Sequence, residues 1–331
     1  MERFALAAAV VLGFALTAAL CSLFVPLRRV LERREQQQQP VQSEQPRPAP
    51  LRAPLWGGLC AAAGTVTAVG VGWLAACVGQ PELLGSEGRL MTRLLTALAG
   101  SLAFGAVGLA EDLARMRSPA ALGLRRDVRL LLEALAAAFV LLLLRAAGCL
   151  PRGLDVPGAG YVLLGSAVPL LWAVLMVALA ECARVAERDE GTVCGAAFVA
   201  MLALMMAEAG LGVPGLAVLP GALAGALVAL GLWAFPPAKL GAGCCGSLLA
   251  AGAIGCIPLS LDMTSLIVPL ALPFWAAGGL LAAQLLCAKR TGKPLRCWVK
   301  KHKMSPETVF LCSFALSAVG YVLALALLRW C

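Results

Sequence analysis

Hydrophobic residues gather along this chain into long runs separated by polar segments, and these runs predict helices that cross a membrane. Each run is about 18 to 24 residues long, the length at which a helix spans a hydrocarbon core of about 30 Å. Asp262 divides the eighth run from the ninth. The ten predicted spans cover residues 4–26, 55–78, 92–110, 130–149, 160–181, 192–209, 213–235, 247–264, 266–287 and 308–329.

Composition agrees with this pattern. Hydrophobic residues make up 61% of the 331 positions and charged residues 14%, whereas about a quarter of a soluble domain is charged. Ala, Gly and Leu dominate the runs, as expected where helices pack closely in lipid. The sequence therefore predicts an all-α polytopic membrane protein, multi-pass in the cell (cytoplasmic) membrane, with residues 1–331 forming a single membrane domain.

The basic residues predict the orientation of the chain. Most of the 27 Lys and Arg residues follow the odd-numbered runs, and cationic loops stay on the cytoplasmic side. Both termini are therefore expected outside, and the odd-numbered loops inside. The net charge of +9 reflects this asymmetry and attraction to anionic headgroups, so nucleic-acid binding is not expected. Residues 35–53, EQQQQPVQSEQPRPAPLRA, predict a flexible Gln- and Pro-rich cytoplasmic linker.

Four cytoplasmic segments have unusual residues at the membrane boundary, and polar loops that converge on one face of a helical bundle favour an active site there. Ionisable groups at membrane depth are candidates for function. The four segments are PLWGG at 54–58, GLAEDLARM at 108–116, ECARVAERDEG at 181–191 and GAGCCGS at 241–247.

The order and spacing of these segments resemble the phospho-N-acetylmuramoyl-pentapeptide transferases of the MraY type, within the polyprenyl-phosphate phosphosugar transferases. APLWGG is similar to the family's P-T-M-G-G, and GLAEDLAR to its G-F-x-D-D-x-x-K. ECARVAERDEG falls in register with N-x-x-N-x-x-D-G-x-D-G, and GCCGS with G-D-x-G-S. The resemblance implies transfer of a phosphosugar from a UDP-sugar to polyprenyl phosphate with release of UMP, in cell-wall or envelope glycan synthesis.

The resemblance also implies site roles. Glu111 and Asp112 stand at the catalytic positions, and Asp112, Glu187 and Glu190 at positions for Mg²⁺. A homodimer is implied as well. The implied substrate-binding residues are Arg115, Glu181, Arg184, Gly243, Gly246, Ser247 and Arg296.

Several identities depart from the family pattern. Glu181 and Arg184 replace two Asn, and Cys244 replaces the Asp of the glycine loop. Mg²⁺ prefers oxygen ligands, whereas a Cys sulfur is soft, so Cys244 does not simply take over from Asp. Impaired standard activity is therefore expected. The alternative is a non-catalytic paralog that binds polyprenyl phosphate or a partner enzyme, and a transporter or flippase is the third hypothesis.

For three sequence features, a purely structural explanation stands as an alternative to the functional one. The acids at 187–190 could form solvated pairs with Arg184 and Arg188 instead of holding a metal ion. The basic loop 289–304 could lie on the anionic leaflet instead of receiving a phosphate. Cys244 and Cys245 favour packing as small apolar residues over zinc or redox chemistry.

Overall fold

The computed structural model describes residues 2–38, 56–79, 88–117, 123–156, 160–163, 165–187, 191–210, 215–235, 238–291 and 305–328. Arg296, Glu190, most of the 35–53 linker and most of the basic loop 289–304 lie outside these ranges. The helices are α1 (Glu2–Gln38), α2 (Gly57–Gly79), α4 (Gly88–Arg117), α5 (Arg126–Ala146), α6 (Val168–Ala186), α7 (Thr192–Gly210), α8 (Val218–Ala234), α9 (Gly243–Ser260), α10 (Ile267–Leu270), α11 (Leu272–Thr291) and α13 (Pro306–Leu328).

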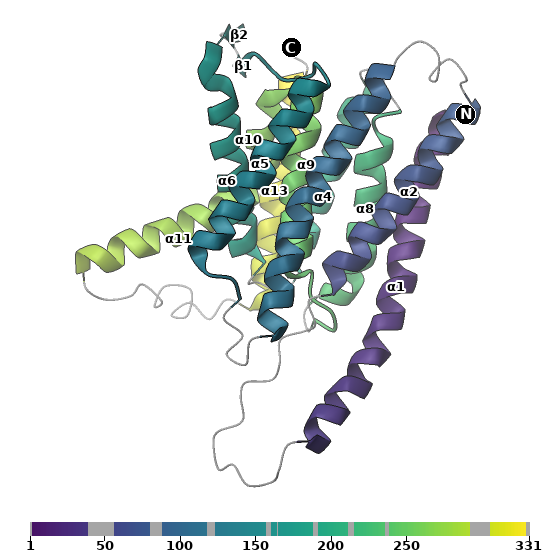
Figure 1. Ribbon diagram of the computed structural model, residues 1–331, viewed down its shortest axis with the longest axis vertical. Coiled ribbons are helices and arrows are strands. Elements are labelled where there is room, and N and C mark those ends of the chain that lie inside the picture. The colour runs from purple at the N-terminus through teal and green to yellow at the C-terminus, as the bar shows by residue number, and fades with distance from the viewer. Residues whose placement is uncertain are drawn as a thin grey trace.

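The helices form an all-α bundle around α9, every residue of which is buried (Figure 1). Its principal neighbour is α4, and α2, α6 and α7 also pack against it. Small residues line these contacts: a side chain at Gly252 would lie 3.0 Å from Phe104 and 3.1 Å from the Ser101 backbone. Small side chains let helices approach closely in lipid, where tight packing replaces the hydrophobic effect as the force between helices.

The outer surface of the bundle is apolar. Val78 is 82% exposed, Leu170 70% and Leu23 66%, a degree of exposure that soluble proteins limit to small patches. Among the described residues, seven helices are long and apolar enough to cross a membrane, or eight if the bent pair around Ala271 is one span. The remaining predicted spans correspond to α5, which carries five charged residues, and to α8, which has 17 residues. The prediction of an all-α polytopic membrane protein is confirmed.

Two predicted spans differ from the observed elements. Residues 160–181 do not begin as a helix, because β1 (Gly153–Val156) and β2 (Gly160–Leu163) pair as an antiparallel hairpin before α6. Residues 266–287 are broken by a 63° bend between α10 and α11, so α11 turns away from the bundle axis (Figure 1). Pro273 stands in the first turn of α11, and a proline disfavours helical geometry at the residue before it. Residues 35–38, predicted as linker, are the end of α1.

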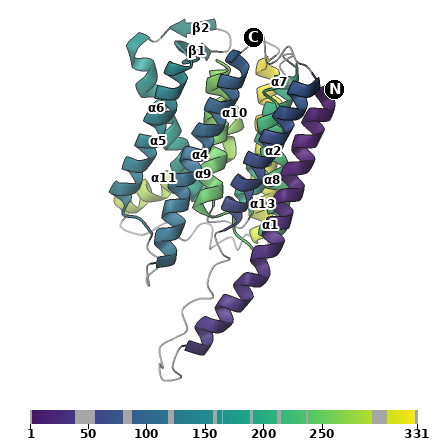
Figure 2. The same ribbon diagram turned by 45° about the vertical axis from the view of Figure 1, so that its right-hand side comes forward.

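The first and last helices of the chain have their outer ends at the same end of the bundle. The N-terminal end of α1 and the C-terminal end of α13 are at the same end as the β1–β2 hairpin, in both views (Figures 1 and 2). The C-terminal end of α4 points to the opposite end, where the sequence analysis placed the functional loops. The structure agrees with a topology in which both termini share one side. That this side is the outer one stays a prediction from the charge distribution.

Candidate functional site

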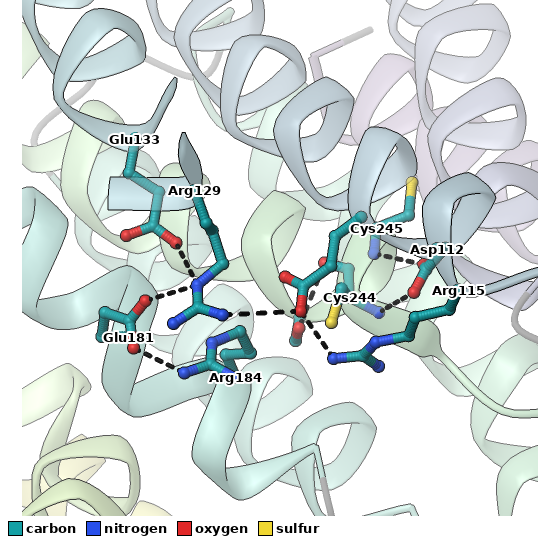
Figure 3. Close-up of polar contacts among 10 residues, drawn as sticks. Asp112, Arg115, Arg129, Glu133, Glu181, Arg184, Cys244 and Cys245 are labelled. Carbon is teal, nitrogen blue, oxygen red and sulfur yellow. Dashed lines mark hydrogen bonds and ion pairs between the residues drawn. The ribbon is translucent and has the colours of Figure 1, made fainter. Parts of the chain in front are cut away.

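The site is built where α4 and α6 end and where α5 and α9 begin. Glu111 and Asp112 lie in the last turns of α4, and both are 2% exposed. Because neighbouring residues on a helix point about 100° apart, the two carboxylates have different partners. Asp112 is directed at the start of α9 (Figure 3). Glu111 pairs with arginines of α4 and α5.

Asp112 caps α9 from the neighbouring helix. Its Oδ1 accepts a hydrogen bond from the backbone N–H of Cys244 at 3.1 Å, and its Oδ2 accepts one from Cys245 at 2.9 Å (Figure 3). The residue before α9, Ala242, provides no side-chain cap, so two of the unsatisfied N–H groups at this helix start depend on Asp112. A carboxylate at a helix N-terminus also interacts favourably with the helix dipole. The glycine loop is therefore an anion-binding helix terminus whose anion is a side chain of the same protein.

The glycines of this region allow backbones to touch. A side chain at Gly108 would lie 2.2 Å from the carbonyl oxygen of Cys244, and one at Gly58 would lie 2.1 Å from the nitrogen of Gly246. Gly243 adopts φ +67°, a conformation that glycine tolerates best, and so turns the chain into α9. Gly243 is therefore explained by its backbone conformation, and Gly246 by packing, because a side chain there would lie 3.1 Å from Ala242 Cβ and 3.2 Å from Gly58 Cα. Their role in substrate binding stays a prediction.

A substitution at Ser247 can distinguish a structural role of the glycine loop from a role in substrate binding. Its side chain is fully buried, and its hydroxyl donates to the carbonyl of Cys244 at 3.1 Å. We expect Ser247→Ala to lower the free energy of unfolding by about 1 kcal/mol, the usual contribution of such a hydrogen bond. Binding of polyprenyl phosphate, measured with a labelled lipid in detergent, should not change. Weaker lipid binding at unchanged stability would restore the substrate-binding role that the resemblance implies.

Arginines and carboxylates beside Asp112 form a network across three helices (Figure 3). Arg115 donates to Glu111 Oε1 at 2.7 Å, within α4. Arg184 donates to Glu181 Oε2 at 2.6 Å, within α6. Arg129 of α5 joins the two pairs: its Nε donates to Glu181 Oε1 at 2.8 Å, and its Nη1 lies 3.8 Å from Glu111 Oε1. The network therefore pairs the carboxylates of Glu111 and Glu181 with three arginines.

Arg129 and Glu133 are site residues that the sequence analysis missed. Arg129 Nε lies 3.9 Å from Glu133 Oε1, and the Glu133 side chain has no exposed surface. Neither oxygen of Glu133 has a hydrogen-bond partner among the described residues. A signal was present, because an Arg and a Glu four residues apart in an apolar helix share one face, and ionisable groups at membrane depth suggest function.

The structure describes some of the remaining site residues that the sequence predicted, but not all of them. Glu187 ends α6 and lies within electrostatic range of Arg115 and Cys244. Arg184 is 12% exposed and pairs with Glu181. Its solvated pairing with the acids at 187–190 stays a prediction, because residues 188–190 lie outside the described residues. Cys244 and Cys245 are 0% and 2% exposed, as small apolar packing requires. Glu190 and Arg296 lie outside the described residues, so their roles stay predictions.

The described donors do not fit a magnesium ion. Mg²⁺ takes an octahedral set of oxygens. Both oxygens of Asp112 accept N–H groups, and Glu111 is held by two arginines. Cys244, at the third expected position, offers a buried sulfur, which suits soft metals. Within the part of the chain that the structure describes, no three His, Cys, Asp or Glu side chains are grouped to hold a metal ion.

Comparison with known proteins identifies a family. The profile described as glycosyl transferase family 4 matches residues 94–262, just over half of the 331 residues. This range includes Asp112, Glu181 and Cys244, together with the whole arginine–carboxylate network. The family contains the MraY-type enzymes and the polyprenyl-phosphate sugar-1-phosphate transferases, and its members generally depend on a divalent metal. None of the curated proteins compared with the chain matches it.

Proposed function

Because this chain belongs to glycosyl transferase family 4, we propose that it binds polyprenyl phosphate at the inner rim of the membrane without catalysing phosphosugar transfer. The family is one of membrane proteins that use polyprenyl phosphate and nucleotide sugars. Transfer between these substrates requires a cation to neutralise the pyrophosphate and free anionic groups to hold that cation. Here the groups at those positions are engaged with each other.

The observation that carries the proposal is the pair of hydrogen bonds from Cys244 and Cys245 to Asp112. Each oxygen of Asp112 already accepts one N–H group of α9, so a metal ion would have to use the remaining lone pairs of a carboxylate that is 2% exposed. The replacement of the glycine-loop Asp by Cys244 removes a further ligand. The geometry therefore supports a site that is complete without metal.

Lipid binding is supported by what the site still offers. Arg115 keeps the cationic position of the motif in the last turn of α4, and its side chain is 22% exposed. A partly exposed guanidinium can donate two hydrogen bonds to a phosphate while its other nitrogens hold Glu111. Exposed apolar side chains on α1, α2 and α6 offer surfaces for the hydrocarbon of a polyprenyl chain.

A UMP-release assay tests the proposal. Purified protein in detergent is mixed with undecaprenyl phosphate, Mg²⁺ and labelled UDP-sugars, with an active family enzyme as the positive control. We expect no UMP, and we expect binding of labelled undecaprenyl phosphate that weakens about tenfold or more in Arg115→Ala, as for loss of a charge-assisted hydrogen bond. UMP release that disappears in Asp112→Asn would refute the proposal. Absence of any lipid binding would refute it as well.

The second candidate is an MraY-type transferase that passes phospho-N-acetylmuramoyl-pentapeptide from its UDP derivative to polyprenyl phosphate. One observation favours it: Glu111, Asp112 and Arg115 remain together at the inner end of α4, with Glu187 in electrostatic range of Arg115. This function requires a metal ion to bind Asp112 through the lone pairs that its hydrogen bonds to α9 leave unused. It would appear in the same assay as UMP release with that one nucleotide sugar. A homodimer and the choice of sugar stay predictions.

A further inference from the structure

A pocket at the hairpin end of the bundle lies apart from the candidate site. Its volume is about 480 Å³, a size that accommodates a small organic group. It lies between the second turn of α4, the end of α5, the β1–β2 hairpin and the turn that follows α9. Its lining includes Arg93, Leu150, Arg152, Tyr161 and Asp262. We refer to it as the hairpin pocket.

Two arginines line this pocket without a carboxylate partner. None of the ion pairs within the described residues includes Arg93 or Arg152, whereas the arginines of the candidate site are all paired. Arg93 Nε is buried and has no hydrogen-bond partner in the described part of the chain. A cation that is partly removed from water is disfavoured unless a negative charge compensates it. An anion in the hairpin pocket would therefore stabilise this guanidinium.

The hairpin adds a hydroxyl group beside these arginines. The backbone N–H of Arg152, just before β1, donates to the hydroxyl of Tyr161 in β2 at 3.0 Å. Because the hydroxyl accepts this bond, its own hydrogen can be donated to a ligand. The backbone N–H groups of Gly148 and Cys149 are already bonded to carbonyls of α5. The donors that the pocket offers to an anion are therefore the side chains of the two arginines and the tyrosine.

The hairpin pocket lies at the level of the lipid headgroups. Arg93 is near the beginning of the predicted span 92–110, Cys149 ends the span 130–149, and Asp262 is near the end of the span 247–264. The hairpin is at the end of the bundle where α1 begins and α13 ends (Figure 1). The ends of apolar spans mark the boundary of the hydrocarbon core, where the phosphates of membrane lipids lie. The position of the pocket therefore favours a lipid phosphate over a soluble anion.

Asp262 predicts a preference among headgroups. Its carboxylate lines the same pocket as the two arginines, so the pocket has charges of both signs and a net charge of about +1. A carboxylate has about four acceptor positions, so it can accept a hydrogen bond from a ligand in addition to one from the chain. A phosphate ester that also carries an ammonium or hydroxyl group is complementary to this arrangement.

We propose that the hairpin pocket binds a phospholipid headgroup, with the phosphate at Arg93 and Arg152 and an amine or hydroxyl group at Asp262. The pocket and Asp112 lie at opposite ends of the bundle, so this lipid is distinct from the polyprenyl phosphate of the proposed function. The inference goes beyond that function and does not depend on it. Arg115→Ala, which should weaken binding of polyprenyl phosphate, should leave headgroup binding in the hairpin pocket unchanged.

Native mass spectrometry of the protein in detergent tests the inference by counting bound lipids. The probes are phosphatidylethanolamine, whose ammonium donates hydrogen bonds, and phosphatidylcholine, whose quaternary ammonium has no N–H group. We expect saturable binding of one phosphatidylethanolamine per chain, about tenfold tighter than that of phosphatidylcholine, as for one hydrogen bond to a charged group. Arg93→Gln and Arg152→Gln should each weaken binding of phosphatidylethanolamine by about tenfold.

Two further variants sharpen the test. Arg145→Gln is the matched control, because Arg145 is exposed in the last turn of α5, at the same end of the bundle, but does not line the pocket. It should bind phosphatidylethanolamine as the wild type does. Asp262→Asn removes the charge and keeps the turn, because φ at this position is 61° and Asn also tolerates this conformation. The preference for phosphatidylethanolamine over phosphatidylcholine should disappear in this variant.

Three outcomes overturn the inference. The first is unchanged binding of phosphatidylethanolamine in Arg93→Gln and Arg152→Gln, which would place the headgroup elsewhere. The second is an equal loss in Arg145→Gln, which would show only general attraction to basic residues. The third is displacement of the lipid by an equal concentration of glycerophosphoethanolamine, which would indicate a site for a soluble phosphate ester. If Arg93→Gln does not fold, Arg152→Gln decides alone, because Arg152 is exposed.

Discussion

Gly108→Ala is expected to disrupt the packing of α4 on α9 and to lower the free energy of unfolding by about 3 kcal/mol or more. A methyl group at this position would lie 2.2 Å from the carbonyl oxygen of Cys244, 2.5 Å from its carbonyl carbon and 2.7 Å from the nitrogen of Cys245. All three are backbone atoms of a fully buried helix, so no side-chain rotation relieves the overlap. Thermal unfolding in detergent measures the effect.

Gly105→Ala is the matched control, because it lies one turn earlier on α4 and faces the same partner helix. There a methyl group would meet the side chain of Leu249 at 3.3 and 3.4 Å, contacts that a small rotation accommodates. Alanine also has the better helix propensity, by about 1 kcal/mol. Gly105→Ala should therefore leave the unfolding midpoint nearly unchanged. Equal losses in the two variants would show that the direct backbone contact does not determine the effect.

Much of the fold could be predicted because the bilayer fixes the length of its helices. The run at 92–110 lies within α4 and the run at 192–209 within α7, and the apolar lengths of both helices match a membrane core. The β1–β2 hairpin was missed because Gly160–Leu163 is continuous in hydrophobicity with α6. The bend at Ala271 was missed although Pro273 marks it, since proline also occurs within spanning helices.

The site could be predicted only as far as local motifs extend. The resemblance placed Asp112 beside the glycine loop, and the structure joins them by two hydrogen bonds across 132 and 133 residues of sequence. The pairing of Arg129 with Glu181 spans 52 residues and belongs to no motif, so a single sequence does not reveal it. The capping of α9 by Asp112 was also not predictable, because an Asp at this motif position is interpreted as a metal ligand until its hydrogen-bond partners are known.

The two halves of the site follow one principle. Asp112 and Arg129 each contact groups of neighbouring helices in the same chain. Asp112 is the anion at the start of α9, and Arg129 is the cation among three carboxylates. Asp112 satisfies two buried N–H groups at the start of α9, whereas both oxygens of Glu133 stay without a hydrogen-bond partner among the described residues.

Asp112→Ala is expected to release the start of α9 and to lower the free energy of unfolding by about 4 kcal/mol. The substitution leaves the N–H groups of Cys244 and Cys245 without their acceptor, at positions that are 0% and 2% exposed, and each unsatisfied donor contributes about 1 to 3 kcal/mol. Asp112→Asn keeps one carbonyl oxygen in the same shape, so its loss should be about half as large.

Thermal unfolding and amide hydrogen exchange measure the two effects together. Exchange at Cys244 and Cys245 should accelerate strongly in Asp112→Ala and moderately in Asp112→Asn, while the amides in the middle of α9 stay protected. Asp127→Ala is the control, because this acid is 85% exposed at the start of α5 and should change neither measurement. If Asp112→Ala is as stable as the wild type and its α9 amides exchange at the wild-type rate, the carboxylate is not held by α9. The second candidate function would then gain support.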